Sequence, residues 1–172
     1  NSVVALSHAL DFLEMDLLGV ASNHSKRVAY IACRIGKAIG LPRDELFDLI
    51  ALAILHDNGI GVASVRGTES VAAASRLSLS GIESAAAHCV AGEENIRTYP
   101  FLTKVEGVIT HHHENWDGSG FFNLAGSAIP RLSRIIRLAD IADQARRAGE
   151  QHIRTLALFA EVIDRLAHEG TK

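Results

Sequence analysis

Histidine and aspartate residues stand where the apolar faces of five predicted helices should be continuous, and this pattern constrains the fold more than any other feature. The other positions on each face recur at helical spacing and are mostly aliphatic. An ionised carboxylate is very costly to bury without a partner, and no lysine or arginine lies on these predicted faces. Divalent metal ions would supply the missing positive charge. The polar positions are His24, Asp57, His88, His112 and Asp140.

Helical spacing recurs along nearly the whole chain, whereas the alternation typical of strands does not. We therefore predict an all-α fold, a compact bundle of about six or seven helices around a metal centre, in a single domain over residues 1–172. Residues 61–80 are predicted to form a loop or a short irregular helix, and residues 115–129 a long loop. The predicted helices are about 3–18, 22–39, 43–57, 81–97, one beginning at Pro100, one beginning at Pro130, and 151–168.

The composition fits one globular domain, because 172 residues of which 48% are hydrophobic can bury a sizeable core. A net charge of -3 gives no indication of a nucleic-acid polymer as partner. No apolar stretch reaches the length of a membrane span. The isolated Cys33 and Cys89 suit a reducing cytoplasm, where we expect them to be small core residues. Since the sequence begins at Asn1 and not at methionine, we expect a domain excised from a longer protein.

Two adjacent pairs of candidate ligands extend this pattern, His56-Asp57 and His112-His113. Neighbouring helix residues point about 100° apart, so each pair could flank a site from one helix. The full set exceeds the four ligands of a structural zinc site and predicts two ions. Mixed nitrogen and oxygen ligands favour iron or manganese, with nickel or zinc as further options. The candidate metal ligands are His24, His56, Asp57, His88, His112, His113 and Asp140.

Each of these residues also has a commoner explanation when it is taken alone. A single inward histidine such as His24 or His88 is usually a hydrogen-bonded core residue, and Asp57 could simply turn the chain where its helix ends. Five helices that converge on the same chemistry favour a metal centre instead. We expect His111 to face away from this centre. The histidines predicted to lie on the surface are His8, His152 and His168.

The order and spacing of these residues resemble the HD superfamily of metal-dependent phosphohydrolases and, more narrowly, its HD-GYP branch. The resemblance covers about residues 22–145, and the string HHENWDGSG is its most specific part. An HD pair alone would be weak evidence. The segments that carry the resemblance are HSKRV at 24–28, HDNG at 56–59, His88, HHENWDGSG at 112–120, IP at 129–130 and RIIRLAD at 134–140.

The resemblance implies a centre of two or three metal ions and hydrolysis of cyclic di-GMP, a bacterial second messenger. A hydroxide between the ions would attack the phosphodiester phosphorus in line, with His56 and Asp57 as the catalytic residues. The ligands that the resemblance implies for one ion are His24, His56, Asp57 and Asp140. The ligands that it implies for a second ion, which shares Asp57, are His88, His112 and His113.

Four features depart from the pattern of the branch. Ile60 stands where the family usually has a lysine that contacts the substrate or protonates the leaving group. Gly120-Phe121-Phe122 lacks the tyrosine and proline of the GYP loop, and Phe121 is the candidate substrate contact there. Arg146 and Arg147 are the candidates to replace a missing arginine-rich stretch. Val20 stands in place of the glutamate of trinuclear members, which predicts two ions.

Three functions follow from these features. The complete ligand set predicts a cytoplasmic phosphodiesterase for cyclic di-GMP or a related nucleotide. The lost lysine, tyrosine and arginines favour instead a signalling module that binds metal and nucleotide, or a signalling protein at the loop of residues 120–122, without turnover. The phenylalanines of this loop could instead pack on Trp116. A purely structural metal domain fits least, because so large a ligand set leaves room for water.

Overall fold

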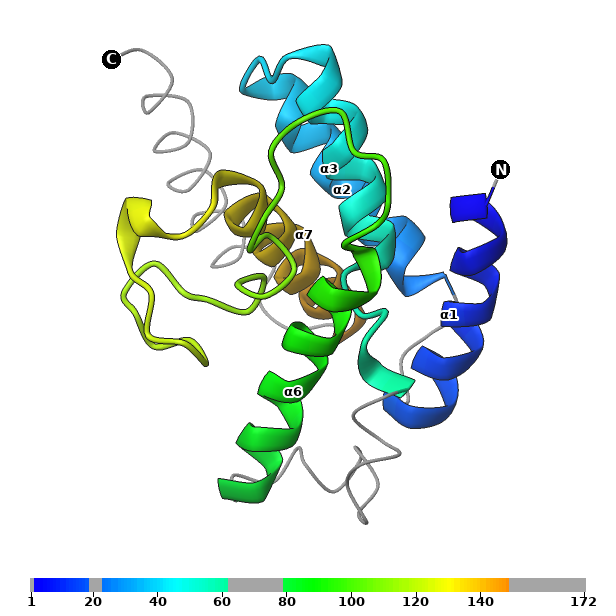
Figure 1. Ribbon diagram of the computed structural model, residues 1–172, viewed down its shortest axis with the longest axis vertical. Coiled ribbons are helices and arrows are strands. Elements are labelled where there is room, and N and C mark those ends of the chain that lie inside the picture. The colour runs from blue at the N-terminus through cyan, green and yellow to red at the C-terminus, as the bar shows by residue number, and fades with distance from the viewer. Residues whose placement is uncertain (1, 19–22, 62–78, 149–172) are drawn as a thin grey trace.

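The computed structural model describes residues 2–18, 23–61 and 79–148 of the chain (Figure 1). Helices joined by turns make up these ranges, which contain no strand, and the predicted all-α fold is confirmed. The predicted helix 151–168 and position 20 lie outside the described residues. The elements are α1 (Ser2–Leu18), α2 (His24–Ala38), α3 (Arg43–Leu55), α6 (Leu79–Ile96), the short 3-10 helix η1 (Gly126–Ala128) and α7 (Arg131–Ala148).

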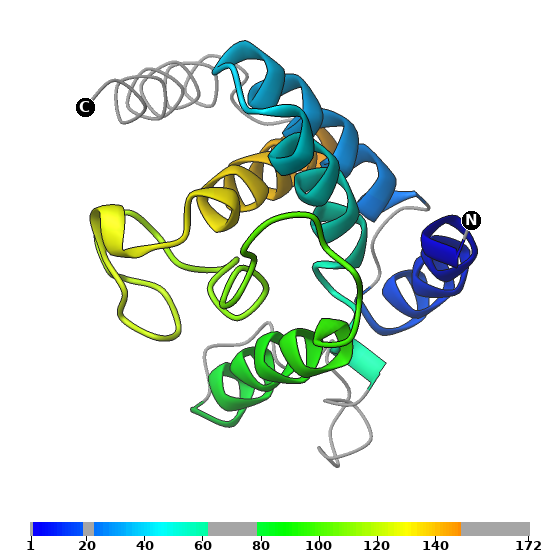
Figure 2. The same cartoon turned by 45° about the horizontal axis from the view of Figure 1, so that its top comes forward.

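Helices α2, α3 and α7 form the core, and α1 lies at the edge against α2 and α3 (Figures 1 and 2). The inward face of α2 carries Val28, Ala32 and Ile35, whose spacing matches the helical repeat. These side chains pack with Leu49 and Leu52 of α3, which are completely buried. Among the described helices, none has both the length and the apolar character needed to cross a bilayer.

Helix α3 ends at Leu55, two residues before its predicted end, and a turn follows it. Gly59 of this turn lies directly against α6. A Cβ atom at Gly59 would come within 2.0 Å of the carbonyl oxygen of His88 and 2.6 Å of the backbone nitrogen of Gly92. The side chain of Asn58 donates a hydrogen bond to the carbonyl of Gly92 at 3.2 Å. The turn thus fixes the position of α6 relative to the end of α3.

The helix predicted to begin at Pro100 is absent, and this prediction was wrong. Residues 97–125, which we call the turn segment, form consecutive turns between α6 and α7 (Figure 2). Gly107 has a φ of 79°, a left-handed conformation that interrupts a right-handed helix. Without a helix, the backbone N–H groups of the segment need other acceptors.

Three carboxylates provide acceptors for these N–H groups. Asp48 of α3 is completely buried and accepts hydrogen bonds from the N–H groups of Leu102 at 3.0 Å and Thr103 at 2.7 Å. Glu93 of α6 accepts hydrogen bonds from three more backbone N–H groups, those of residues 107, 109 and 110. Glu114, which lies within the turn segment, accepts hydrogen bonds from the backbone N–H groups of residues 122 and 124. Because hydrogen bonds to an ionised acceptor are strong, these contacts can replace the ladder of a helix.

Candidate metal centre

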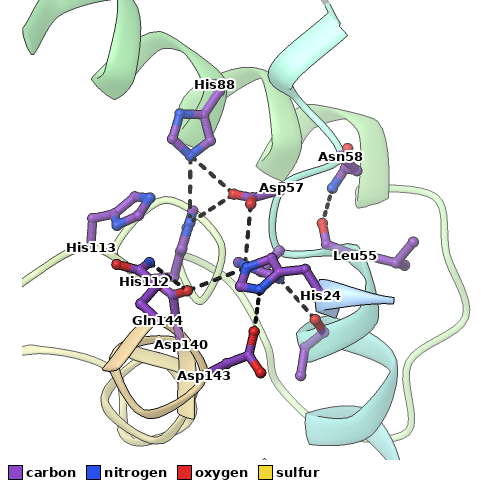
Figure 3. Close-up of polar contacts among 12 residues, drawn as sticks. His24, Leu55, Asp57, Asn58, His88, His112, His113, Asp140, Asp143 and Gln144 are labelled. Carbon is purple, nitrogen blue, oxygen red and sulfur yellow. Dashed lines mark hydrogen bonds and ion pairs between the residues drawn. The ribbon is translucent and has the colours of Figure 1, made fainter. Parts of the chain in front are cut away.

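The seven predicted ligands lie together where α2, α7, the turn after α3, α6 and the turn segment meet (Figure 3). Six of them are buried and His113 is partly buried. Two adjacent pairs of them arise from different local structure than expected. His56 and Asp57 lie in the turn beyond α3, and His112 and His113 lie in the turn segment. Neither adjacent pair therefore reaches the site from within a helix.

One group consists of His24, His56 and Asp140, and we call it the His24 half. One nitrogen of each imidazole and one oxygen of Asp140 lie within 4.8 Å of one another. The Nε2 atom of His24 is 3.3 Å from Oδ1 of Asp140, which also accepts a hydrogen bond from Gln144 at 2.8 Å. These donors come from α2, α7 and the end of α3, so regular elements of the core position this half.

Both imidazoles of the His24 half are anchored through their other ring nitrogen. Nδ1 of His56 donates to the backbone carbonyl of Ala53 at 2.9 Å, and Nδ1 of His24 lies 2.9 Å from Oδ2 of Asp143. Arg27 in turn contacts Asp143, at 2.6 Å from Nε to Oδ1. An acceptor at Nδ1 fixes the tautomer that leaves the Nε2 lone pair for a metal ion.

The second group consists of His88, Cys89, His112 and His113, and we call it the His88 half. One ligand atom of each lies within 4.8 Å of the others. The Nε2 atoms of His88 and His112 are 3.5 Å apart, and Nδ1 of His112 lies 2.6 Å from the carbonyl oxygen of Ile109. Cys89 is buried as predicted, but sequence reasoning missed its place in this group. Its position directly after His88 was the only signal in the sequence.

Asp57 lies between the two halves and contacts both (Figure 3). Its Oδ2 atom is 3.3 Å from Nε2 of His56. Its Oδ1 atom is 3.5 Å from Nε2 of His88 and 3.6 Å from Nε2 of His112. A carboxylate in this position can offer one oxygen to each of two ions.

The carboxylates and imidazoles of the metal-free centre shift one another's pKa values. Burial raises the pKa of Asp57, but His56, His112 and His88 outweigh burial and hold this pKa well below its usual range. Burial lowers the pKa of His24, yet contacts with Asp140 and Asp143 raise it overall to about 9. Metal ions that bind here must displace such protons, because a ligating imidazole has to be neutral.

In the His88 half, the pKa values of His112 and His113 shift in opposite directions. The pKa of His112 rises to about 10, since Asp57 and Cys89 outweigh the opposing effect of burial. For His113, burial and the neighbouring His112 and His88 lower the pKa well below 6.5. Burial raises the pKa of the Cys89 thiol, but His112 and His88 outweigh it and lower this pKa from 9.0 to about 7.

The donor set fits divalent transition-metal ions. The Oδ2 atom of Asp140 is buried and accepts no hydrogen bond from the described residues. Its ion-pair partner, Nη1 of Arg137, is 3.8 Å away. A buried carboxylate oxygen without a donor is costly, and a cation at this point would compensate for it. Imidazole, carboxylate and thiolate ligands together suit iron, zinc, nickel and manganese to different degrees.

Arg137 was missed, and the expectation that no arginine lies near the inward faces was wrong for α7. Its Nη1 atom is 3.4 Å from Nδ1 of His113, and its Nε and Nη2 atoms donate to Oδ1 of Asn115 at 3.2 and 3.1 Å. Arg137 precedes Asp140 by three residues, so both lie on one face of α7. This spacing was the signal in the sequence that could have identified it.

The loop of residues 120–122 lies beside the His88 half. The ring of Phe121 is 5.3 Å from that of His113, and the ring of Phe122 is 5.6 Å from that of His111, measured between centroids. The guanidinium of Arg134 lies 5.5 Å from the ring of Trp116, which is 42% exposed. Phe121 is thus an aromatic surface next to the predicted ligands.

The other residues singled out in the sequence lie outside the two groups of candidate ligands. His111 belongs to neither group of candidate ligands, and its Nδ1 atom lies 2.7 Å from the carbonyl oxygen of Gly107. His8 is exposed, as predicted, and Ile60 is buried. Arg146 and Arg147 lie in α7, but their side chains are outside the described part of the structure, as are His152 and His168 entirely.

Comparison with known proteins gives one family and two relatives from Vibrio cholerae. The HD domain family matches residues 13–158. The 3'3'-cGAMP-specific phosphodiesterase 1 is 30% identical over 142 residues, which are 80% of this chain and 29% of that protein. A cyclic di-GMP phosphodiesterase is 40% identical over 52 residues, which are 30% of this chain and 11% of that protein. The chain thus spans less than a third of the curated relatives that it matches.

A crystal structure of a cyclic GMP-AMP-specific phosphodiesterase from Vibrio cholerae has a similar fold. The TM-score is 0.70 at 23% sequence identity, and the match covers 96% of this chain and 48% of that chain. The helices described above therefore form a known arrangement, and the similarity extends over nearly the whole chain.

Proposed function

Because the chain belongs to the HD domain family, we propose that it is a metal-dependent phosphodiesterase that hydrolyses cyclic di-GMP or a related cyclic dinucleotide. The observation that carries this proposal is the place of Asp57, whose two carboxylate oxygens face different groups of imidazoles. This arrangement is suited to two neighbouring ions. The named activities of the two curated relatives support the class of substrate. The HHENWDGSG string supports assignment to a divergent member of the HD-GYP branch.

We assign the ligands of the two ions to the two halves. Asp57 would join both sets and bridge the ions. Bound iron or manganese, or alternatively nickel or zinc, would supply Lewis-acid stabilisation of the phosphodiester oxygens and would acidify water. The ligands of one ion are His24, His56, Asp140 and Asp57. The ligands of the other are His88, His112, His113 and Asp57.

The chain's own residues have distinct roles in this proposal. His56 and Asp57 are the catalytic residues, because they hold the ions at the reacting phosphate. Arg137 places a guanidinium beside the His88 half, where it can pair with a phosphate oxygen. The ring of Phe121 offers a face on which a nucleobase can stack. Arg146 and Arg147 extend α7 with further positive charge for the second phosphate.

Hydrolysis of cyclic di-GMP and of 3'3'-cGAMP tests the proposal directly. The protein is purified without oxygen and loaded with Fe²⁺ or Mn²⁺, and products are separated by chromatography. We expect turnover in the wild type and at least about a 100-fold loss in His112→Ala, which removes a proposed metal ligand. The matched control is His111→Ala, since the neighbouring His111 is in neither group of candidate ligands. Two bound ions without turnover of either nucleotide would contradict the proposal.

A binding module without turnover is the second candidate, and one observation favours it. Ile60 is 4% exposed at the position of the family's lysine, so this position supplies no positive charge to a leaving group. Calorimetry with metal-loaded protein distinguishes the two functions, because a binding module would bind the nucleotide and leave it intact. The contacts of Phe121 and Phe122 with histidines favour a nucleotide over a signalling protein as the partner of this loop.

A further inference from the structure

We infer that Cys89 is a fifth protein ligand of the ion on the His88 half, beside His88, His112, His113 and Asp57, and that its thiolate makes the two metal sites chemically unequal. This inference rests on the proposed metal centre and assigns a ligand that the HD motifs do not include. Cys89 is completely buried, and its Sγ atom lies 3.5 Å from Nε2 of His88. It also lies within 4.8 Å of a ring nitrogen of His112 and one of His113.

The packing of α6 explains why two adjacent residues can reach one site. His88, Cys89 and Gly92 occupy neighbouring positions on one side of the helix. Gly92 lies against the backbone of Gly59, and a Cβ atom there would come within 2.9 Å of a methyl carbon of Ile109. This side of α6 therefore faces both the turn after α3 and the turn segment. The metal site lies between these same two parts of the chain.

The surroundings of Cys89 differ from those of an ordinary core cysteine. A structural cysteine is a small apolar residue that packs among other apolar side chains. The Sγ atom of Cys89 instead lies in a group of three imidazoles, each a proposed ligand. A thiol in this position adds a soft donor to three borderline nitrogen donors and the carboxylate oxygen of Asp57, so the ion would have five protein donors.

The thiolate would change which ion the His88 half selects. Metal binding would release the thiol proton to solvent and form a sulfur–metal bond. Thiolate ligands favour zinc and iron, whereas carboxylate and water suit manganese. The His24 half, with two imidazoles and the carboxylates of Asp140 and Asp57, has no such donor. Zinc or ferrous iron should therefore bind the His88 half more tightly than manganese does.

Cobalt(II) spectroscopy tests the inference independently of activity. In the wild type loaded with two cobalt ions, we expect a thiolate-to-cobalt charge-transfer band in the near ultraviolet. The band should be lost in Cys89→Ser, while the weaker visible bands of cobalt on the His24 half persist. Zinc affinity at one of the two sites should fall by about 10- to 100-fold in this variant, with manganese affinity nearly unchanged. Cys33→Ser is the matched control and should keep the band.

X-ray absorption of the zinc-loaded wild type gives a second measurement that needs no variant. A sulfur neighbour at about 2.3 Å, beside nitrogen and oxygen at about 2.0–2.2 Å, supports the inference. Two bound ions with neither a charge-transfer band nor a sulfur neighbour would overturn the role of Cys89 and leave the proposed function intact. Protein that binds no metal ion at all would overturn both.

Discussion

The two halves of the centre contain similar donors, but the protein holds them in different ways. In the His24 half, both imidazoles have an acceptor at Nδ1, and their backbones belong to α2 and the end of α3. In the His88 half, His112 has such an acceptor, while His113 faces the guanidinium of Arg137. Both imidazoles of the first half are thus oriented for a cation, whereas one imidazole of the second half faces a guanidinium, whose Nη1 atom also lies 3.8 Å from Oδ2 of Asp140 in the first half.

This difference has a consequence for the protonation of His113. A guanidinium can only donate hydrogen bonds, so Nδ1 of His113 offers its lone pair to Arg137. In a neutral imidazole the proton is then on Nε2. For Nε2 to ligate an ion, Arg137 has to release Nδ1 and the proton has to leave. We therefore expect the His24 half to fill first when metal is added to the metal-free protein.

The largest effect should come from Asp57→Asn, which removes the difference by weakening both halves. Asp57 contacts imidazoles of both halves. The loss of its charge should lower the affinity for each ion by more than about 100-fold, because the loss of a residue that only supports a ligand usually costs about 10- to 100-fold. Metal content after dialysis measures this loss. The exposed Asp117→Asn serves as the control. Retention of two ions by Asp57→Asn would contradict the shared role of this carboxylate.

A smaller and one-sided effect is expected from Asp143→Asn. This change removes the charged acceptor at Nδ1 of His24 and should lower ion affinity by about 10- to 100-fold in the His24 half alone. At limiting metal concentration, the number of ions per chain should then fall from two towards one. An equal loss at both sites would show that the halves are not independently anchored.

A change of pH should alter the stability of the metal-free protein through His24. The pKa of His24 is raised from 6.5 to about 9 in the folded state by Asp140 and Asp143, against the effect of burial. The resulting stability is fully present below pH 6.5 and is lost as the pH rises through 9, an effect of roughly 1–2 kcal/mol. Urea unfolding of chelator-treated protein at pH 6.5 and pH 9.5 measures it. A drop of the same size in Asp143→Asn would count against this ion pair as the cause.

The smallest effect, and the one of opposite sign, is expected from Arg137→Gln. Removal of a positive charge near His113 and Asp140 should strengthen ion binding at the centre by about 5-fold, or roughly 1 kcal/mol. Competitive titration with a chromophoric chelator can resolve this change. Arg134→Gln, on the same helix but over the ring of Trp116, is the control. Weaker ion binding in Arg137→Gln would mean that Arg137 positions ligands more than it repels cations.

The helices of the core were predictable from sequence because their apolar spacing is local. Val28 and Ile35 mark the buried face of α2, and the same spacing placed His24 on that face. The turn segment was not predictable in this way. Residues 102–112 show helical spacing, but the carboxylates of Asp48 and Glu93, from other elements, accept hydrogen bonds from N–H groups of this stretch. Contacts so distant in sequence leave no periodic signal, and tertiary hydrogen bonds overrode the local pattern.

The site was predictable to a similar extent. The candidate ligands could be listed because histidine and aspartate are unusual on an apolar face. The partners that make the halves different could not be identified from the sequence. Arg137 and Cys89 are common residues in helices, and only the packing of α7 and α6 shows which way they face.

The anchoring of the turn segment also bears on the order in which the molecule folds. Asp48 and Thr103 are 55 residues apart in the chain, so their contact closes a long loop and forms late. Until that contact exists, His112 and His113 have no fixed position, while the helices that carry His24 and Asp140 can already pack. Metal binding by the His88 half is therefore expected in the last stage of folding. A refolding experiment that follows cobalt absorbance would record when the chain has finished closing.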